Sequence, residues 1–469
     1  MQTAERRSIA TPADLAGRRA LVLGLARSGL AAARFLARCG ASVTAYDRRS
    51  AAELADNVAS LGEAPVRLAL GAPPEEVTAL LANADLVVTS PSISARFPTT
   101  EAWLRRALAE AEGAGAQLVS EVDLFLRLTR ARVLAVTGTK GKTTTTALLG
   151  AMFAQGGVAH LVGGNIGTPL IDRVEELDDD GWAVLELSEL QLPTISRGAD
   201  LSLYTNITAD HLDRHGTVEA YRAVKWRLAR LARGPLILNA EDPGCAELRD
   251  RLFGVSAHWY GISRGEACLR DGRLVVGDRQ LLEAAEVPLP GEHMLRDVLG
   301  AALAASLAGV DPQAIATAIR GFRGVPHRLE TVGEWGGVRW VNDSQATIPD
   351  AAIAALRSFG ERPVVLIAGG SDKGLDYGAF ADEVARHARL AILIGETAGD
   401  VERRIGGRVP VRRASDMEDA VGRAAAAACP GDVVLLSPAA ASFDMFTDYA
   451  ARGDAFRSAA GRIGPKEGA

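Results

Sequence analysis

Short apolar runs of four or five residues alternate along almost the whole chain with longer stretches rich in alanine, leucine and arginine. Runs that are apolar throughout are typical of strands covered on both faces, and the longer stretches between them have the composition of helices. This alternation predicts an α/β protein built on parallel sheets.

The runs fall into three consecutive series. At 469 residues the chain is also too long to pack around one hydrophobic core. We therefore expect three domains, spanning residues 1–117, 118–324 and 325–469. The predicted strands are 19–23, 42–46 and 85–89 in the first series, 133–136, 183–187 and 201–205 in the second, and 339–341, 364–368, 390–394 and 432–436 in the third, and the clearest helices are 30–38, 144–155 and 218–231.

Composition narrows the class of protein. A net charge of −6 and a pI near 5.8 give no reason to expect nucleic acid or an anionic membrane as a partner. Cys39, Cys245, Cys268 and Cys429 are far apart, which suits a reducing compartment and argues against a disulfide framework or a zinc site. The N-terminus lacks the apolar segment of a signal peptide, and no apolar run could span a bilayer. We expect a soluble cytoplasmic monomer without membrane insertion.

The sequence Thr137-Gly-Thr-Lys-Gly-Lys-Thr143 lies between a predicted strand and a predicted helix. In that setting backbone N–H groups and a helix N-terminus bind phosphate. Lys142 would reach the β- and γ-phosphates, and the hydroxyl group of Thr143 would bind Mg²⁺. The common G-x-x-x-x-G-K-[ST] pattern is incomplete because Val136 stands at its first glycine. We therefore expect a shortened ATP-binding loop.

A second glycine-containing turn, Gly24-Leu-Ala-Arg-Ser-Gly29, follows the first predicted strand. It resembles the dinucleotide-binding pattern G-x-G-x-x-G, and Asp47 ends the next strand where a ribose-binding acid would stand. Ala26 replaces the middle glycine and removes the close backbone approach that a pyrophosphate needs. An NAD-dependent oxidoreductase remains an alternative, but a module that binds UDP fits this turn better.

An ordered set of motifs from about residue 18 to about residue 462 resembles the Mur ligase family, which also carries the shortened loop T-G-T-x-G-K-T. No single motif decides the resemblance, whereas the order and spacing of the set do. The motifs are Gly163-Gly-Asn-Ile-Gly167, Leu185-Glu-Leu-Ser188 with Gln191, Asn206-Ile-Thr-Ala-Asp-His-Leu-Asp213, Tyr221-Arg-Ala-Val-Lys225, Pro326-His-Arg328, Asn342-Asp-Ser344 and Ser437-Pro-Ala-Ala-Ala-Ser442.

The resemblance implies a Rossmann-like UDP-binding domain, a central P-loop-type ATPase domain and a C-terminal Rossmann-like domain that binds glutamate. It implies an ATP-dependent amide ligase of peptidoglycan biosynthesis. Such an enzyme activates the carboxylate of UDP-N-acetylmuramoyl-L-alanine as an acyl phosphate and joins it to D-glutamate. ATP and Mg²⁺ are the implied cofactors, and Lys225 is implied to be carbamylated, which converts a cation into a metal ligand.

The resemblance also assigns roles to single residues. The implied catalytic residues are Lys142, Glu186, His211 and Lys225, and the implied Mg²⁺ ligands are Thr143, Glu186, His211 and Lys225. The implied ATP contacts are Gly138, Thr139, Lys140, Gly141, Lys142, Thr143, Thr144, Asp297, Arg328 and Asp343. The implied contacts with the UDP-linked substrate are Ala26, Arg27, Ser28, Asp47, Arg48, Ser92, Asn165 and Ser188, and those with glutamate are Thr347, Lys373, Ser442, Phe443 and Tyr449.

Four positions depart from the pattern of the family. Lys140 replaces a loop asparagine, and Glu189 stands in an altered wall near the muramoyl group. Asp297 lies in a segment without the usual adenine-binding asparagines, and Gln345 replaces a lysine near the amino-acid site. The loss of that lysine leaves L-glutamate open as the acceptor. The intact catalytic set argues against a third alternative, a catalytically dead nucleotide-binding relative.

Overall fold

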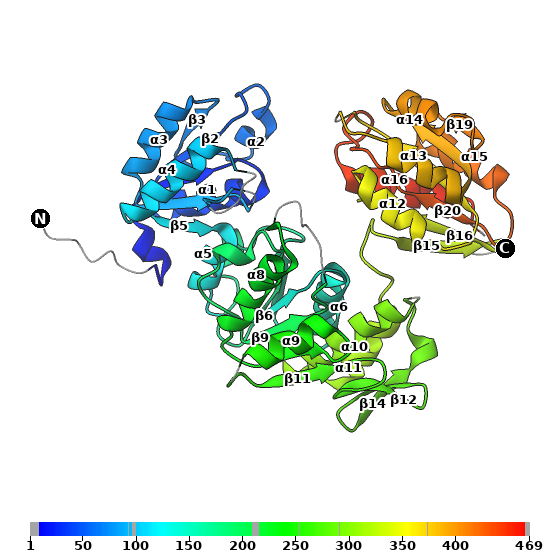
Figure 1. Cartoon of the computed structure of the whole chain (residues 1–469), viewed down its shortest axis with the longest axis horizontal. Coiled ribbons are helices and arrows are strands. Elements are labelled where there is room, and N and C mark those ends of the chain that lie inside the picture. Colours follow the sequence, from blue (N-terminus) through cyan, green and yellow to red (C-terminus); the bar gives the residue numbers. More distant parts are fainter. Residues whose placement is uncertain are drawn as a thin grey trace, which may run out of the picture. The chain divides into compact units, whose positions relative to one another are not determined.

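The computed structural model describes residues 9–91, 93–95, 100–208, 215–252, 254–289, 291–372 and 374–464. The chain forms two compact units, Met1–Phe322 and Arg323–Ala469, which are described in turn. The first unit contains a five-stranded and a nine-stranded sheet, and the second contains a six-stranded sheet (Figure 1). The predicted fold class of three α/β domains is confirmed. The domain boundaries after residues 117 and 324 stay predictions.

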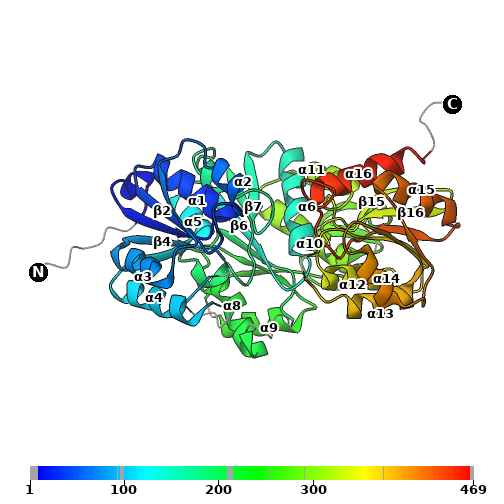
Figure 2. The ribbon, with the colours of Figure 1, turned by 90° about the horizontal axis from the view of Figure 1, so that it is seen from above.

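The N-terminal sheet is entirely parallel. Its elements are β1 (Arg19–Leu23), α1 (Arg27–Arg38), β2 (Ser42–Asp47), α2 (Ala55–Ala59), β3 (Val66–Leu70), α3 (Pro74–Asn83), β4 (Leu86–Thr89), α4 (Ala102–Gly113) and β5 (Gln117–Ser120). The strand order is β3-β2-β1-β4-β5, with α1 on one face and α3 and α4 on the other (Figure 2). Successive side chains of β1 point to opposite faces of the sheet. Val22 packs against α1 on one face, and Leu21 and Leu23 pack against α3 and α4 on the other.

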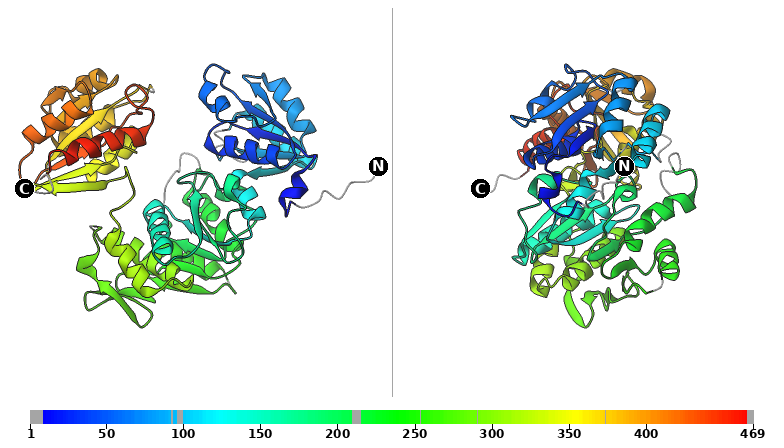
Figure 3. Two further views of the ribbon diagram at one scale, coloured as in Figure 1. Left: turned by 180° about the vertical axis from the view of Figure 1, so that it is seen from behind. Right: turned by 90° about the vertical axis from the view of Figure 1, so that its left-hand side faces the viewer.

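The central sheet is parallel from β7 to β12 and antiparallel at its other end. Its strands are β6 (Arg132–Thr137), β7 (His160–Gly164), β8 (Trp182–Glu186), β9 (Leu201–Tyr204), β10 (Leu236–Asn239), β11 (Ala257–Tyr260), β12 (Ala267–Arg270), β13 (Arg273–Val276) and β14 (Arg279–Glu283). Their order is β14-β13-β12-β11-β10-β9-β6-β8-β7, and the antiparallel edge is drawn in light green in Figure 3.

Helices cover both faces of the central sheet. They are α5 (Glu121–Leu128), α6 (Lys142–Gln155), α8 (Val218–Arg230), α9 (Pro243–Arg251), α10 (Glu292–Leu307) and α11 (Pro312–Gly321). Helices α6, α10 and α11 pack on one face, and α8 and α9 pack on the other. In β6, Val133 and Ala135 point to the second group of helices, while Leu134 and Val136 point to the first.

The two sheets of the first unit share one hydrophobic core. The apolar cluster under α1 continues through α5 into the face of the central sheet that carries α8 and α9. Polar contacts add to it: Arg34 pairs with Asp172 at 2.6 Å, and the backbone N–H of Ile171 donates to Glu121 at 3.0 Å. Burial raises the pKa of Glu121 to about 7. The continuous core explains why the two sheets form one compact unit.

The second unit is a six-stranded sheet with helices on both faces. Its elements are β15 (Glu330–Trp335), β16 (Val338–Asn342), α12 (Pro349–Arg357), β17 (Val364–Gly369), α13 (Gly378–His387), β18 (Ala388–Ile394), α14 (Ala398–Ile405), β19 (Val411–Arg413), α15 (Met417–Ala427), β20 (Val433–Leu436) and α16 (Tyr449–Gly461). The order is β15-β16-β20-β17-β18-β19, parallel except for β15. Helices α12, α13 and α14 lie on one face, and α15 and α16 lie on the other (Figure 2).

Each of the predicted strands and helices is confirmed, with small shifts at the ends. The sequence pattern did not predict the strands β5, β10 and β11, the strands β12 to β15, or the edge strands β3, β7 and β19. The edge strand β3 buries only one of its five residues, so its sequence carries little of the apolar signal of a central strand. Among the described residues, no helix is long and apolar enough to cross a membrane.

Replacing Gly29 with alanine will destabilise the first unit. A Cβ atom at this position of α1 would lie 1.8 Å from the carbonyl oxygen of Gly24, so the helix and the preceding turn would have to move apart. We expect the free energy of unfolding to fall by roughly 1–3 kcal/mol, measured as a lower midpoint of thermal unfolding. Gly113→Ala is the matched control, because nothing lies within 4 Å of a Cβ atom there. An unchanged midpoint for Gly29→Ala would contradict the close approach.

Candidate functional site

The loop between β6 and α6 takes its shape from the end of the neighbouring strand β9. The backbone N–H groups of Thr139 and Lys140 donate to the carbonyl and side-chain oxygens of Asn206, at 2.9 and 3.0 Å. The hydroxyl group of Thr205 donates to the carbonyl oxygen of Lys140 at 2.5 Å. Gly141, with a φ of +85°, caps the start of α6. The first N–H groups of a helix have no helical partners, which is the arrangement that binds phosphate.

Two further loop residues carry the expected chemistry. The Nζ atom of Lys142 donates to the carbonyl oxygens of Gly138 and Thr139, at 3.0 and 2.9 Å. Its positive charge is therefore held over the loop, where it can attract phosphate oxygens. Thr143 is buried one residue further along α6. The remaining predicted contact of this segment, Thr144, follows in the same helical turn.

A buried carboxylate lies beside the loop at the end of β8. Glu186 is paired with Val136 of β6 and is 1% exposed. Asn165, which follows β7, donates from Nδ2 to Oε1 of Glu186 at 2.9 Å, while no described residue donates to Oε2. A buried carboxylate oxygen without a donor raises the free energy of the protein unless a donor or a cation reaches it. This oxygen therefore fits Mg²⁺, which prefers oxygen ligands.

Lys225 reaches the same loop from α8. It is 0% exposed, and its Nζ atom donates to the carbonyl oxygen of Gly138 at 2.9 Å and to Oγ1 of Thr137 at 3.4 Å. The ring centre of Tyr221 lies 5.5 Å from Nζ, and the phenol of Tyr221 hydrogen-bonds the hydroxyl group of Thr139 at 3.0 Å. The predicted lysine is thus part of the phosphate-loop region and does not face solvent.

The structure brings together part of the predicted metal site. Thr143, Glu186 and Lys225 all lie around the carboxyl ends of β6 and β8, where parallel sheets place ligand groups. His211 lies outside the described residues. Across the described part of the chain, no group of three or more His, Cys, Asp or Glu side chains could hold a metal ion. The oxygen of Glu186 that has no donor is therefore the observation that favours a cation here.

Two further predicted contacts of the first unit have partners within the protein. The backbone N–H and the hydroxyl group of Ser188 both donate to Oε1 of Gln191, at 3.1 and 3.0 Å. Asp297 of α10 is buried against the phosphate loop: a Cβ atom on Gly141 would lie 2.4 Å from its Oδ1 atom. Burial raises the pKa of Asp297 to about 7, although Arg296 acts in the opposite direction.

In the N-terminal sheet, Asp47 is bonded to the turn that the sequence singled out. Its Oδ2 atom accepts from the backbone N–H of Leu25 at 2.9 Å, and Arg49 donates to both carboxylate oxygens at 3.0 and 2.9 Å. Burial acts to raise the pKa of Asp47, but the hydrogen bonds from Arg49 and Leu25 outweigh it and lower this pKa. Sequence reasoning missed Arg49, whose only signal was a basic side chain two residues after an acid.

The other predicted contacts of this sheet lie around the same turn. Arg27 donates to the carbonyl oxygen of Gly167 at 3.0 Å, so it connects the turn to the segment after β7. Ala26, Arg27 and Arg48 are exposed, Ser28 is half-buried, and Ser92 lies outside the described residues.

In the second unit, Asp343 lies buried where β16 ends. The hydroxyl group of Ser437 donates to Oδ2 at 2.8 Å, and the backbone N–H of Leu329 donates to Oδ1 at 3.1 Å. Burial raises the pKa of Asp343 to about 7 in spite of these hydrogen bonds and of Arg328. Arg328 is exposed between His327 and Leu329, whose φ values of +63° and +45° are strained for residues with side chains.

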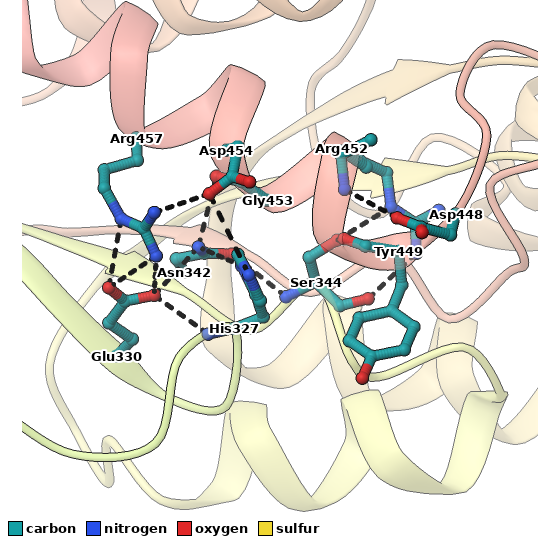
Figure 4. A network of polar contacts seen from close by, with 11 residues as sticks. His327, Glu330, Asn342, Ser344, Asp448, Tyr449, Arg452, Gly453, Asp454 and Arg457 are labelled. Atoms are coloured by element: carbon teal, nitrogen blue, oxygen red, sulfur yellow. Dashed lines mark hydrogen bonds and ion pairs between the residues drawn. The ribbon is translucent and has the colours of Figure 1, made fainter. Parts of the chain in front are cut away.

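Figure 4 shows the polar network that supports this strained segment. Asn342 donates from Nδ2 to Glu330 at 3.1 Å and contacts Nδ1 of His327 at 3.1 Å. The backbone N–H of His327 donates to Glu330 at 2.8 Å, and Arg457 of α16 donates to the same carboxylate at 2.9 Å. The network therefore ties both ends of the segment that carries Arg328 to α16.

Arg452 is a buried charge that sequence reasoning missed. It donates to Oγ and the carbonyl oxygen of Ser344, at 3.0 and 2.9 Å (Figure 4). It also donates to the carbonyl oxygens of Ala440 and Ala441, at 3.0 and 2.8 Å. Burial lowers the pKa of Arg452 to about 10. This guanidinium group joins the loop after β16 to the loop after β20. No local sequence pattern marked it, because its partners lie up to 108 residues away.

The predicted glutamate contacts lie on or near these two loops. Ser442 is buried, Thr347 and Tyr449 are half-buried, and Phe443 is 71% exposed. Lys373 lies outside the described residues. The ring of Tyr449 packs edge-on against that of His327, with 6.1 Å between ring centres.

Comparisons with known sequences cover nearly the whole chain. Three family profiles match, described as "Mur ligase MurD-like, N-terminal domain" over residues 18–112, "Mur ligase middle domain" over 136–305 and "Mur ligase, glutamate ligase domain" over 327–440. The UDP-N-acetylmuramoylalanine–D-glutamate ligase of Solibacter usitatus is 42% identical over 459 residues, 97% of this chain and 100% of that protein. The ligase of the same name from Symbiobacterium thermophilum is 41% identical, covering 94% of this chain and 97% of that protein.

Solved structures show a similar fold. UDP-N-acetylmuramate–alanine ligase from Thermotoga maritima has a TM-score of 0.55 at 17% identity, covering 95% of this chain and 99% of that one. UDP-N-acetylmuramoyl-L-alanyl-D-glutamate–2,6-diaminopimelate ligase has a TM-score of 0.55 at 18% identity, covering 99% and 97% of the two chains. At these identities the likeness establishes the fold.

Glu186→Gln will stabilise the protein in the absence of divalent cations and weaken its response to them. The amide keeps an oxygen for Asn165 but removes a buried negative charge that has an oxygen without a donor. We expect a gain of roughly 1–3 kcal/mol in the free energy of unfolding without metal, and a smaller rise in thermal midpoint when Mg²⁺ and nucleotide are added. Glu219→Gln, an exposed position of α8, is the control. A variant that responds to Mg²⁺ as the parent does would contradict the assignment of Glu186.

Proposed function

The chain belongs to the Mur ligase family, and from that premise we propose that it joins D-glutamate to UDP-N-acetylmuramoyl-L-alanine at the expense of ATP, as a step of peptidoglycan synthesis in the cytoplasm. Its relatives of about 40% identity over nearly the full length carry the name of that D-glutamate ligase. The structural observation that carries the proposal is the gathering of Glu186 and Lys225 at one phosphate loop. The NAD-dependent oxidoreductase alternative does not fit a chain whose three matched domains are ligase domains.

The first step forms an acyl phosphate. A carboxylate oxygen of the muramoyl-alanine substrate attacks the γ-phosphorus of ATP, and the bond to the β–γ bridging oxygen breaks to release ADP. Lys142 is held over the loop and would offset the negative charge that gathers on the γ-phosphate. The N–H groups at the start of α6 add a fixed positive potential that needs no rearrangement during the reaction.

The second step forms the amide bond. The neutral amine of D-glutamate attacks the acyl carbon, the nitrogen loses a proton to solvent, and inorganic phosphate leaves from the tetrahedral intermediate. We assign Arg328 and Asp343 to ATP, and Thr347, Lys373, Ser442, Phe443 and Tyr449 to glutamate, on the family resemblance. Arg452 supports this assignment because it fixes the two loops from which Thr347 and Ser442 extend.

Among the described residues, the proposed metal ligands lie in or beside the phosphate loop. Thr143 and Glu186 would hold Mg²⁺ together with His211, and Mg²⁺ when bound would neutralise phosphate charge. Carbamylation of Lys225 would replace its buried ammonium group by a carboxylate-like group. Burial of the whole side chain, with Nζ 2.9 Å from the carbonyl oxygen of Gly138, supports this modification, because a carbamate there would supply a further oxygen ligand for the metal.

A panel of amino acids tests the proposed function. With ATP, Mg²⁺ and UDP-N-acetylmuramoyl-L-alanine, D-glutamate should give phosphate release at least tenfold faster than L-glutamate. Lys142→Ala should lower this release by at least a hundredfold, whereas Arg279→Ala, an exposed position of β14, should keep the parent rate. Faster release with L-glutamate would replace our assignment by the L-glutamate alternative.

Carbamylation is tested by chemical rescue. Lys225→Ala should be nearly inactive, and added formate or acetate should restore part of the activity by occupying the vacated space beside Gly138 with a carboxylate. Chloride at the same ionic strength is the control for added salt. Full activity of the alanine variant, or rescue by chloride equal to that by formate, would count against a carbamate at this position.

A further inference from the structure

The carboxyl group of Asp297 lies directly against the phosphate loop. A Cβ atom built on Gly141 would be 2.4 and 2.6 Å from the two carboxyl oxygens, closer than real Cβ contacts come. Gly141 is the residue at which the loop turns into α6. The contact arises because α10, which carries Asp297, packs on the same face of the sheet as α6. An acidic group therefore borders the place where the loop would hold the phosphates of ATP.

The surroundings of Asp297 do little to stabilise a negative charge. The residue is 7% exposed, and burial raises its pKa to about 7. On α10, Arg296 acts against that rise, but its guanidinium group already pairs with Glu241 at 2.8 Å and with Glu292.

The elements packed against Asp297 contribute both neutral and charged groups. Helix α6 contributes the hydroxyl group of Thr145, and β11 contributes the phenol of Tyr260, whose own pKa is raised chiefly by burial and further by Asp297. The phosphate loop contributes Lys140 and Lys142, of which Lys142 donates to loop carbonyl oxygens.

We propose that Asp297 couples nucleotide binding to the protonation of its own carboxyl group, so that the enzyme binds ATP with Asp297 neutral. An ionised carboxyl group would face the negative triphosphate across a buried, weakly screened space. A neutral one removes that repulsion and can donate a hydrogen bond. The inference rests on the proposed function only in that the loop binds the phosphates of ATP.

The sign of the pH dependence follows from linkage. Below pH 7 the carboxyl group is mostly neutral, so its contribution to affinity is constant. Above pH 7 each unit of pH lowers the neutral fraction about tenfold, and the Kd for nucleotide should rise by up to tenfold per unit. One proton should be taken up on binding when the free enzyme has Asp297 ionised.

The test measures binding and not turnover. The full-length protein is titrated with a non-hydrolysable ATP analogue and Mg²⁺ by calorimetry between pH 6 and pH 9, without the muramoyl substrate. Asp297→Asn carries a permanently neutral amide of the same shape, and Asp278→Asn makes the same change at an exposed position between β13 and β14. At pH 8.5 the Asp297→Asn variant should bind at least tenfold more tightly than the parent, and Asp278→Asn should bind as the parent does.

Proton uptake gives a second readout that needs no variant. Titrations at pH 8 in two buffers of different ionisation enthalpy should show the parent protein taking up close to one proton more than Asp297→Asn. If that variant does not fold, uptake by the parent that rises between pH 6.5 and pH 8 supports the proposal.

Two results would overturn the coupling, and only the second would also overturn the proposed ATP-dependent function. Equal pH dependence and equal proton uptake in the parent and in Asp297→Asn would overturn the coupling alone. A lack of nucleotide binding at every pH would overturn the ATP-dependent function as well.

Discussion

The site of the first unit depends on the hydrogen bonds between the phosphate loop and the end of β9. The backbone N–H groups of Thr139 and Lys140 donate to Asn206, and the hydroxyl group of Thr205 donates to the carbonyl oxygen of Lys140. These bonds require β9 to lie parallel to β6 and directly beside it, in the register that pairs Val136 with Leu203. The hydrogen bonds from the end of β9 therefore fix the conformation of the loop. Helix α6 begins with its N–H groups directed at the space where phosphate would bind.

The parallel arrangement also decides which other residues reach the loop. Glu186 ends β8, the strand on the other side of β6, and Asn165 follows β7, the strand beyond it. Adjacent parallel strands place such residues at one edge of the sheet whatever their separation in sequence. Glu186 is a buried charge with one oxygen that no described residue donates to, which lowers the stability of the fold. Its place at this edge is therefore explained by binding and not by stability.

The fold and the core of the site could be predicted, because both leave local signals. The apolar runs marked ten of the strands, although not β10 and β11 of the central sheet, and Lys142 and Thr143 follow from a short motif between a strand and a helix. Arg452 could not be predicted, since its partner Ser344 lies 108 residues away, and a basic side chain two residues after Asp47 was too weak a signal to single out Arg49. Asp297 is an intermediate case. The sequence shows that Asp297 departs from the family pattern of asparagines, but only its burial against Gly141 indicates the effect of that difference.

The core shared by the two sheets of the first unit has a consequence for synthesis of the chain on the ribosome. Helix α1 is complete after 38 residues, but the cluster it joins includes side chains of β8 and α8, and its ion-pair partner Asp172 follows Arg34 by 138 residues. A nascent chain that has emerged only as far as β5 therefore exposes the apolar surface around α1, because β8 and α8, which cover it, have not yet been synthesised. The cluster under α3 and α4 is made of residues up to 118, whereas the face under α1 is closed only by the central sheet, so we expect this face to become buried late in synthesis.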